Sequence, residues 1–286
     1  MFRTTHSKIW NRVIRSRATQ PVLGRCGANG ERGLWIFILG NYNSGTTLLY
    51  ELLRNQEGIS SLPWEGSRLT HFFSDPNDYG WPRMWHACKE KMRAAEAELE
   101  TKHARRIKRQ WNWSASGNAP VFVEKSITNA TRIPFLTKHF SPAFFIHIVR
   151  NPYASSEGIQ RKAHPDPIRS GSGLSSYSLS MCAQQWVTSN QLIESELSHC
   201  NSVRITYEDL CKDPKKVLEK ISSSCPRLHE LGVHIETHNE LKVHGASGKI
   251  SNQNEKSISR LQHKEREEIT RVALEMMKQY GYQVTS

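Results

Sequence analysis

Apolar residues recur along this chain with two spacings, one typical of buried strands and one typical of helices. Four short runs rich in β-branched and aromatic residues predict strands, and helical patterns separate them. These runs cover residues 34–39, 120–123, 143–149 and 202–206. The alternation predicts βαβ units around a buried parallel sheet, and therefore a three-layer α/β fold.

Four segments carry helical periodicity, at residues 46–55, 83–111, 177–200 and 263–280. The last precedes Gly281, which suits a C-cap position. The basic end of the second, from Arg105 to Arg109 and including Lys108, shows no matching apolar stripe. We therefore expect it on the surface. Two long loops, 58–82 and 163–176, contain several Pro or Gly residues and are typical of lids or binding loops.

Positive charge is concentrated at the amino terminus. The chain carries a net charge of +12, and residues 1–33 hold seven Lys or Arg against the single acid Glu31. We expect residues 1–32 to be a disordered basic tail, with an organelle transit peptide as the alternative, and residues 33–286 to form one domain. A basic balance suits polyanionic partners, among which charge alone does not choose.

The cysteines predict no metal site. All six lie far apart, without a C-x-x-C pair or a zinc-like cluster with histidine. Cys182 is expected to be a buried thiol, and a disulfide between Cys211 and Cys225 would require an oxidising compartment. No apolar run approaches the roughly 18 residues of a membrane-spanning helix, so we expect none. The compartment stays open between the cytoplasm and the Golgi lumen.

The most informative segment joins the first predicted strand to the first helix. Residues 40–47 read GNYNSGTT, which matches the P-loop pattern G-x-x-x-x-G-K-[ST] except that Thr46 replaces the lysine. Two glycines let the backbone wrap around a phosphate, and the helix N-terminus adds its positive dipole end. Without the lysine that holds the β- and γ-phosphates of an NTP, the loop suits a single phosphate, such as the 5′-phosphate of a nucleoside.

Polar side chains also follow the other predicted strands. Glu124 and Lys125 come after the second, Arg150 after the third and Tyr207 after the fourth. Ligands of open parallel sheets bind outside the carboxyl ends of the strands. We therefore expect these residues to face the crevice that also holds the loop at residues 40–47.

At these positions the chain resembles the sulfotransferase family that includes the tyrosylprotein and carbohydrate enzymes. The resemblance spans roughly residues 34–284 and rests on GNYNSGTTLL, EKS at 124–126, FIHIVRNP at 145–152, and YEDL at 207–210 followed by Asp213 and Pro214. It implies a P-loop NTPase-like fold. It also implies transfer of a sulfonate group from 3′-phosphoadenosine 5′-phosphosulfate (PAPS) to an acceptor hydroxyl or amine.

The resemblance assigns roles to individual residues. Arg150 would grip the 3′-phosphate, assisted by Lys162, and Tyr207 would lie near the nucleotide. Lys125 would stabilise charge on the bridging oxygen, and Glu65 would take the acceptor's proton. The 5′-phosphosulfate would lie on Gly40, Asn43, Ser44, Gly45, Thr46 and Thr47.

Three positions depart from the family. Asn43 stands where Arg or Lys is common, Gly158 where a serine contacts the 3′-phosphate, and Ser126-Ile127 where many members have Thr-Pro or Asp-Pro. A Gly158→Ser change is therefore expected to tighten nucleotide binding. Lys249 and Arg260 are further candidates for closing over the nucleotide.

Two other functions remain as alternatives. A P-loop small-molecule kinase would share the fold, although the missing lysine and the lack of a convincing Walker-B aspartate count against it. A catalytically inactive nucleotide- or nucleic-acid-binding module would use the basic tail, but the chain has no recognised nucleic-acid motif, so we expect no nucleic-acid partner. The acceptor stays open among carbohydrate, protein tyrosine and small molecules.

Overall fold

A single parallel sheet organises the molecule. The computed structural model describes residues 12–26, 30–235, 241–243, 246–248 and 250–285. The sheet has five strands in the order β2-β3-β1-β4-β5. Their bounds are β1 (Leu34–Gly40), β2 (Ile59–Ser61), β3 (Val121–Lys125), β4 (Ala143–Val149) and β5 (Ser202–Thr206). The four predicted strands are present, and β2 is an additional three-residue edge strand, too short to show a period.

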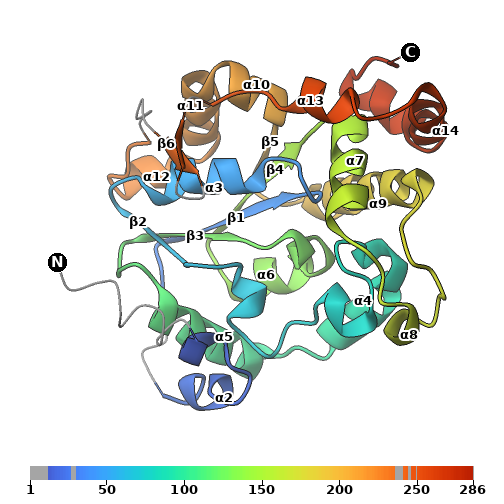
Figure 1. Ribbon diagram of the computed structural model, residues 1–286. Helices are drawn as coiled ribbons and strands as arrows, with labels where there is room; N and C mark the ends of the chain where they lie inside the picture. Colours follow the sequence, from blue (N-terminus) through green and yellow to red (C-terminus); the bar gives the residue numbers. More distant parts are fainter. Residues whose placement is uncertain (1–11, 27–29, 236–240, 244–245, 249, 286) are drawn as a thin grey trace.

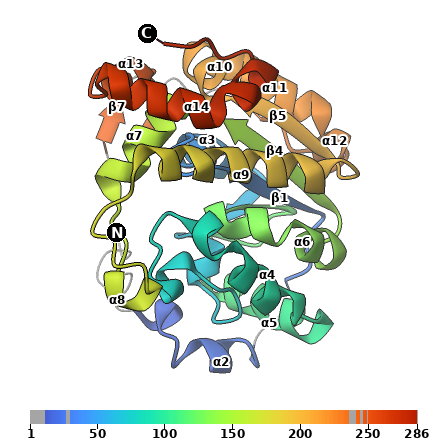
Figure 2. The same cartoon turned by 90° about the vertical axis from the view of Figure 1, so that its right-hand side faces the viewer.

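Helices cover both faces of this sheet, which confirms the predicted three-layer α/β class (Figures 1 and 2). Those above it in Figure 1 are α3 (Thr46–Arg54), α10 (Tyr207–Lys212), α11 (Pro214–Ser224) and α12 (Pro226–Glu230). Those below it are α2 (Gln20–Leu23), α4 (Lys89–Ala97), α5 (Thr101–Ser114) and α6 (Ile133–His139). The right-hand side of that view holds α7 (Pro152–Lys162), α8 (Pro167–Ser170), α9 (Leu179–Leu197), α13 (Asn254–Ile258) and α14 (His263–Tyr280).

Short elements occupy the connections. The 3-10 turns are η1 (Gly66–Arg68), η2 (Pro76–Tyr79), η3 (Trp85–Cys88) and η4 (Ile127–Thr131). Strands β6 (Leu241–Val243) and β7 (Ala246–Gly248) pair with each other as a separate antiparallel ribbon. Gly281 takes a left-handed conformation at the end of α14, as predicted for its C-cap.

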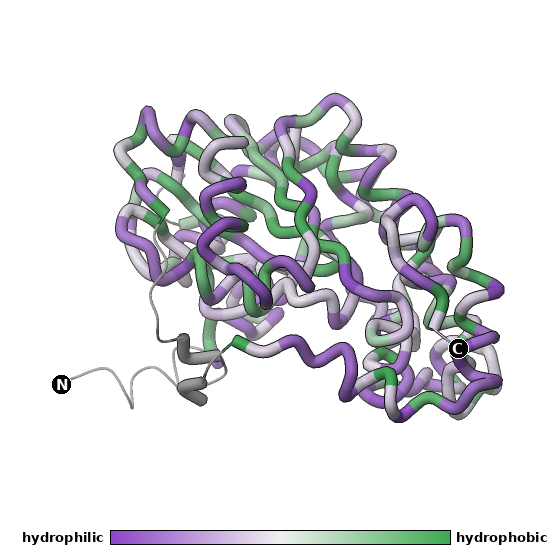
Figure 3. The backbone as a smooth tube through the Cα atoms, turned by 90° about the horizontal axis from the view of Figure 1, so that it is seen from above, coloured by the Kyte–Doolittle hydropathy of each residue, from purple (hydrophilic) through white to green (hydrophobic). Residues whose placement is uncertain are grey.

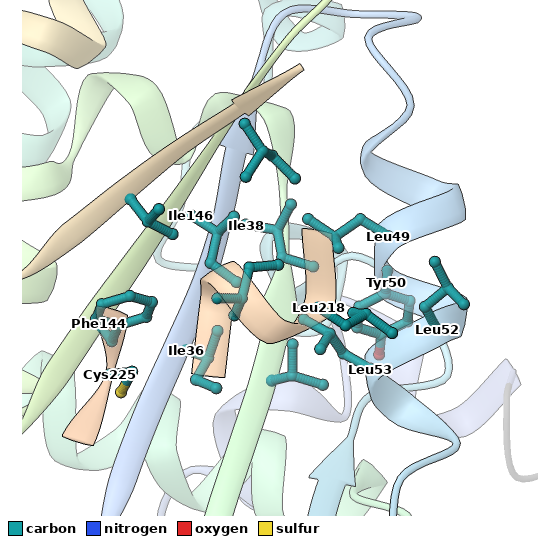
Figure 4. Packing of buried hydrophobic residues seen from close by; sticks show 14 of the residues in the cluster. Ile36, Ile38, Leu49, Tyr50, Leu52, Leu53, Phe144, Ile146, Leu218 and Cys225 are labelled. Carbon is teal, nitrogen blue, oxygen red and sulfur yellow. The ribbon is translucent and has the colours of Figure 1, made fainter. Parts of the chain in front are cut away.

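The central strand β1 is buried along its whole length, and its residues contribute to the hydrophobic cores on both faces of the sheet. Its alternate residues Ile36 and Ile38 pack against Leu49 and Leu53 of α3 (Figure 4). On the other face, Trp35 lies 4.8 Å from Phe122 and 5.0 Å from Phe140 between ring centroids. A strand that is apolar on both faces requires a helical layer on each side, so the position of β1 fixes where the following loop emerges.

The region from residue 83 to 111 differs from the single helix that we expected. It divides into η3, α4 and α5, and a capping box at Glu100 and His103 starts α5. Helix α5 does have an apolar stripe, which includes Ile107 and the fully buried Trp111. Lys108 is therefore buried and not on the surface, with its Nζ 3.1 Å from an oxygen of Glu31.

The amino-terminal segment also differs from the expected disordered tail where it is described. Ile14 is 2% exposed and belongs to the core below the sheet, because the segment packs over α5 and η1. Gln20 is equally buried, and its amide donates to the carbonyl of Arg68 at 3.1 Å. The domain boundary at residue 33 stays a prediction, but these contacts lead us to expect that removal of residues 1–32 would destabilise the fold.

Hydropathy follows the layers. In Figure 3 the hydrophobic, green stretches lie mostly within the body, and the outer helices alternate between green and purple. No helix within the described ranges is both long and apolar enough to cross a membrane. All six cysteines are free, so Cys211 and Cys225 do not form a disulfide, and Cys182 is buried as predicted.

Candidate active site at the P-loop

The loop at residues 40–47 joins β1 to α3 and needs both of its glycines. A β-carbon on Gly40 would come within 2.6 Å of the carbonyl oxygen of Ile148 on β4. Gly45 has φ +92°, and a β-carbon there would lie 2.4 Å from the Tyr207 ring. Close approach and a left-handed backbone therefore both exclude larger residues.

This loop ends at backbone N–H groups that no side chain caps. Gly45 is the N-cap of α3 and has no side chain with which to cap the first-turn N–H groups. The Ser44 hydroxyl instead donates to the carbonyl of Asn41 at 2.7 Å, which stabilises the turn itself. Free N–H groups at a helix start, with the positive end of the helix dipole, form an anion-binding site.

Arg150, directly after β4, is held rigidly beside this loop. It is 7% exposed, and its guanidinium donates to the Asn43 carbonyl and to Asn254 Oδ1, each at 2.7 Å. Its Cζ also lies 4.3 Å from the centroid of the Tyr207 ring. One guanidinium nitrogen has no partner among the described residues, and this cation has no ion pair there. An unpaired buried donor next to an anion-binding loop suits a phosphate oxygen.

A cationic pocket of about 360 Å³ opens from Arg150 between α7 and α13. Five basic residues line it, namely Arg150, Arg161, Lys162, Lys256 and Arg260. Lys162 Nζ donates to Asn43 Oδ1 at 3.1 Å. Partial desolvation, followed by the nearby charges of Arg83, Arg161 and Arg150, lowers the pKa of Lys162. Such an excess of positive charge favours a multiply charged anion.

Gly158 lies against the P-loop in this pocket. Its α7 backbone is helical, but a β-carbon would come 2.9 Å from both Cγ and Nδ2 of Asn43. The two departures from the family therefore touch each other, because the Asn43 side chain occupies the space beside Gly158. The nearby hydroxyls of Ser155 and Ser156 are buried and have no hydrogen-bond partner within the described parts of the chain.

Glu65 and Lys125 come together across 60 residues of sequence. Lys125 ends β3, and its Nζ donates to Glu65 Oε1 at 2.7 Å. Both side chains are partly buried, at 13% and 27% exposure. The lysine and the carboxylate that the sequence predicted to act together are thus in direct contact.

A buried carboxylate, that of Glu124, holds the two segments that carry this pair. Glu124 is fully buried, and burial raises its pKa. It accepts hydrogen bonds from the Gly66 backbone N–H at 2.7 Å, from the Ser126 hydroxyl and from the Asn129 amide. Because Gly66 follows Glu65 and Ser126 follows Lys125, Glu124 fixes both segments that carry the pair.

The predicted residues thus form two neighbouring groups. Asn43, Gly45, Arg150, Lys162 and Tyr207 contact one another on one side of the loop, and Glu65 pairs with Lys125 on the other. Gly40, Ser44, Thr46 and Thr47 form the loop between them. Their roles remain predictions.

Some residues of this region were not singled out from the sequence. Arg161 and Asn254 join the cationic side, and Ser126, seen only as a departure, supports the other. Lys249 lies outside the described residues.

A larger cavity of about 520 Å³ lies beside Gly58 and Leu231, at the amino ends of β2 and β3, and includes none of the predicted site residues.

The comparison with known families agrees with the resemblance. A model described as the sulfotransferase family matches residues 36–227, about two thirds of the chain. The matched range contains the P-loop and both groups of predicted residues. The chain therefore belongs to the sulfotransferase family.

Solved structures show the same fold. The sulfotransferase domain from the curacin biosynthetic pathway is 22% identical, with a TM-score of 0.50, over 87% of this chain and 98% of that one. Sulfotransferase STF9 from Mycobacterium avium is 14% identical, with a TM-score of 0.53, over 95% of this chain and 84% of that one. Among curated proteins, none matches this chain.

Proposed function

We propose that the protein is a PAPS-dependent sulfotransferase that transfers a sulfonate group to an acceptor hydroxyl or amine. The observation that carries this proposal is the juxtaposition of an anion-binding loop, a cationic pocket and a lysine–carboxylate pair. The loop suits one phosphate and the pocket suits a second. The pair supplies one cation and one base between which a group transfer can occur.

The nucleotide would bind through both phosphates. Its 5′-phosphosulfate would accept hydrogen bonds from the backbone between Gly40 and Thr47, at the start of α3. Its 3′-phosphate would enter the pocket of about 360 Å³ and contact the free nitrogen of Arg150, with Lys162 and Arg260 nearby. Tyr207 already stacks on Arg150 and would keep that guanidinium oriented.

Lys125 and Glu65 would carry out the transfer of the sulfonate group. When bound, PAPS supplies the activated sulfonate. Glu65 takes the proton from the acceptor oxygen or nitrogen, which forms a bond to sulfur while the bond from sulfur to the bridging oxygen breaks. The electron pair remains on that bridging oxygen, and Lys125 stabilises the resulting charge. Before substrates bind, Glu65 and Lys125 neutralise each other, so the donor anion competes with the carboxylate for the ammonium.

The test is sulfonate transfer by the purified chain from sulfur-labelled PAPS to a panel of glycans, tyrosine peptides, phenols and amines. We expect label in at least one acceptor class and none when γ-labelled ATP replaces the donor. Phosphate transfer from ATP without sulfonate transfer would instead select the kinase. Salt-sensitive binding of duplex DNA without turnover would favour the nucleic-acid-binding alternative.

A further inference from the structure

The P-loop of this chain has no basic side chain. Its eight residues, 40–47, include neither Lys nor Arg. Asn43 adopts a left-handed backbone with φ 62°, a conformation that Asn tolerates better than long side chains do. Positive charge at the sulfonate position must therefore come from other elements.

Arg83 is a basic residue in the turn between η2 and η3, and it lies beside this P-loop. It shares with Asn43 a positive backbone φ, at 58°, which is unusual for a long side chain. Such strain persists only where the surroundings impose it, and it is frequent at functional sites.

The surroundings do impose the conformation at Arg83. The next residues, Met84 and Trp85, are both fully buried. The carbonyl of the preceding residue, Pro82, accepts a hydrogen bond from the Tyr177 hydroxyl at 2.9 Å. The backbone is thus fixed on both sides of Arg83, and this sets the direction of its Cα–Cβ bond.

That side chain points to the P-loop. The Arg83 Cζ lies 5.9 Å from the ring centroid of Tyr42, the residue before Asn43. Its charge is also one of the causes that lower the pKa of Lys162, whose ammonium donates to Asn43. Within the described part of the chain, Arg83 forms no ion pair with a carboxylate. Its charge is therefore available to a bound anion.

Resting on the proposed function, we propose that Arg83 binds the sulfonate group of the donor and supplies, from the turn before η3, the cation that the P-loop lacks. A guanidinium donates two parallel hydrogen bonds to oxyanions, so it can hold two sulfonate oxygens during transfer. Lys125 then serves the bridging oxygen alone. Adenosine 3′,5′-bisphosphate, which has no sulfonate, does not use Arg83.

The test compares Arg83→Gly with the wild-type protein, using turnover with PAPS and calorimetric binding of adenosine 3′,5′-bisphosphate. Glycine keeps the left-handed backbone and removes only the side chain. We expect kcat to fall roughly tenfold to a hundredfold, as for a lost charge-assisted hydrogen bond, with the bisphosphate Kd within about threefold. Arg83→Lys should retain more activity than Arg83→Gly.

Matched variants exclude indirect effects. Arg83→Asn also tolerates this backbone and should reproduce the loss if the glycine variant unfolds. Arg105→Ala, at an exposed position of α5, should leave kcat unchanged.

Three results with an active wild-type protein would overturn the assignment of Arg83. They are an unchanged kcat, bisphosphate binding weakened in proportion to kcat, and a rise only in the acceptor KM. Absence of sulfonate transfer by the wild-type protein would remove the proposed function itself, and the assignment with it.

Discussion

On the α7 side of the P-loop, cations outnumber carboxylates, whereas on the β3 side the cation has a carboxylate partner. Five basic residues line the α7 pocket, and Glu157 offsets two of them, with its Oε1 2.5 Å from Arg161 and 3.2 Å from Arg260. At β3, Lys125 pairs with Glu65 at 2.7 Å. Uncompensated positive charge favours tight binding of an anion, whereas a paired carboxylate and ammonium would suit group transfer once a substrate separates them. Substitutions on the two sides should therefore affect different quantities.

The largest effect is expected at Lys125. Lys125→Ala removes the charge that we propose stabilises the bridging oxygen, and loss of one such electrostatic contact lowers kcat about a hundredfold to a thousandfold. The Kd of adenosine 3′,5′-bisphosphate should change little, because this ligand does not develop that charge. Steady-state kinetics and calorimetry measure the two quantities, with the exposed Lys138→Ala as the control. An unchanged kcat would exclude Lys125 from the mechanism.

Arg150→Ala should give the opposite pattern. We expect adenosine 3′,5′-bisphosphate to bind roughly tenfold to a hundredfold more weakly, since a charge-assisted hydrogen bond is lost. Adenosine 5′-phosphosulfate, which has no 3′-phosphate, should lose much less affinity. The measurement is the ratio of the two dissociation constants before and after substitution. A constant ratio would mean that Arg150 does not recognise the 3′-phosphate.

Removal of residues 1–32 should affect the β3 side and spare the α7 side. The deletion exposes the pocket of Ile14, whose burial contributes about 1.5–3 kcal/mol, so the melting temperature should fall by several degrees. It also removes Arg15, whose Cζ lies 4.7 Å from the Trp64 ring next to Glu65, so kcat should decrease. Deletion of residues 1–11 is the control, because it keeps these contacts. If the chain without residues 1–32 had the same melting temperature as the full chain, the domain would begin at residue 33 as the sequence predicted.

Gly158 should give the smallest effect. The sequence suggested that Gly158→Ser would tighten nucleotide binding, but a β-carbon would displace the Asn43 side chain. We now expect Gly158→Ser and Gly158→Ala to weaken bisphosphate binding equally, by a few-fold, because the β-carbon and not the hydroxyl causes the conflict. Calorimetry of both variants separates the two ideas. Tighter binding by the serine variant alone would show that the hydroxyl contacts the phosphate.

Local patterns predicted the sheet and the P-loop because each depends on residues that are close in sequence. The strand ends then indicated Lys125 and Arg150 as candidate site residues, since the carboxyl ends of parallel strands share one edge. Strand β2 is too short to carry a period. The surface position expected for Lys108 was wrong because α5 packs its apolar stripe under the sheet.

Contacts between distant segments could not be predicted in the same way. Arg83 begins the segment for which the sequence predicted a single helix, but it lies in a turn before η3, and the packing of Met84 and Trp85 directs it to the P-loop. The contact between Asn43 and Gly158 likewise depends on how α7 meets the loop. The sequence shows Asn43 and Gly158 as two separate departures from the family that the chain resembles. Only the structure shows that the two residues are in contact.

Calorimetric titration with adenosine 3′,5′-bisphosphate, compared with adenosine 5′-monophosphate, tests the central claim most directly. The two ligands differ only in the 3′-phosphate that the cationic pocket would receive. We expect saturable binding of the bisphosphate at one site, tighter than that of the monophosphate by roughly tenfold to a hundredfold. No binding of the bisphosphate, or equal affinity for both ligands, would contradict the assignment of this protein as a PAPS-dependent sulfotransferase.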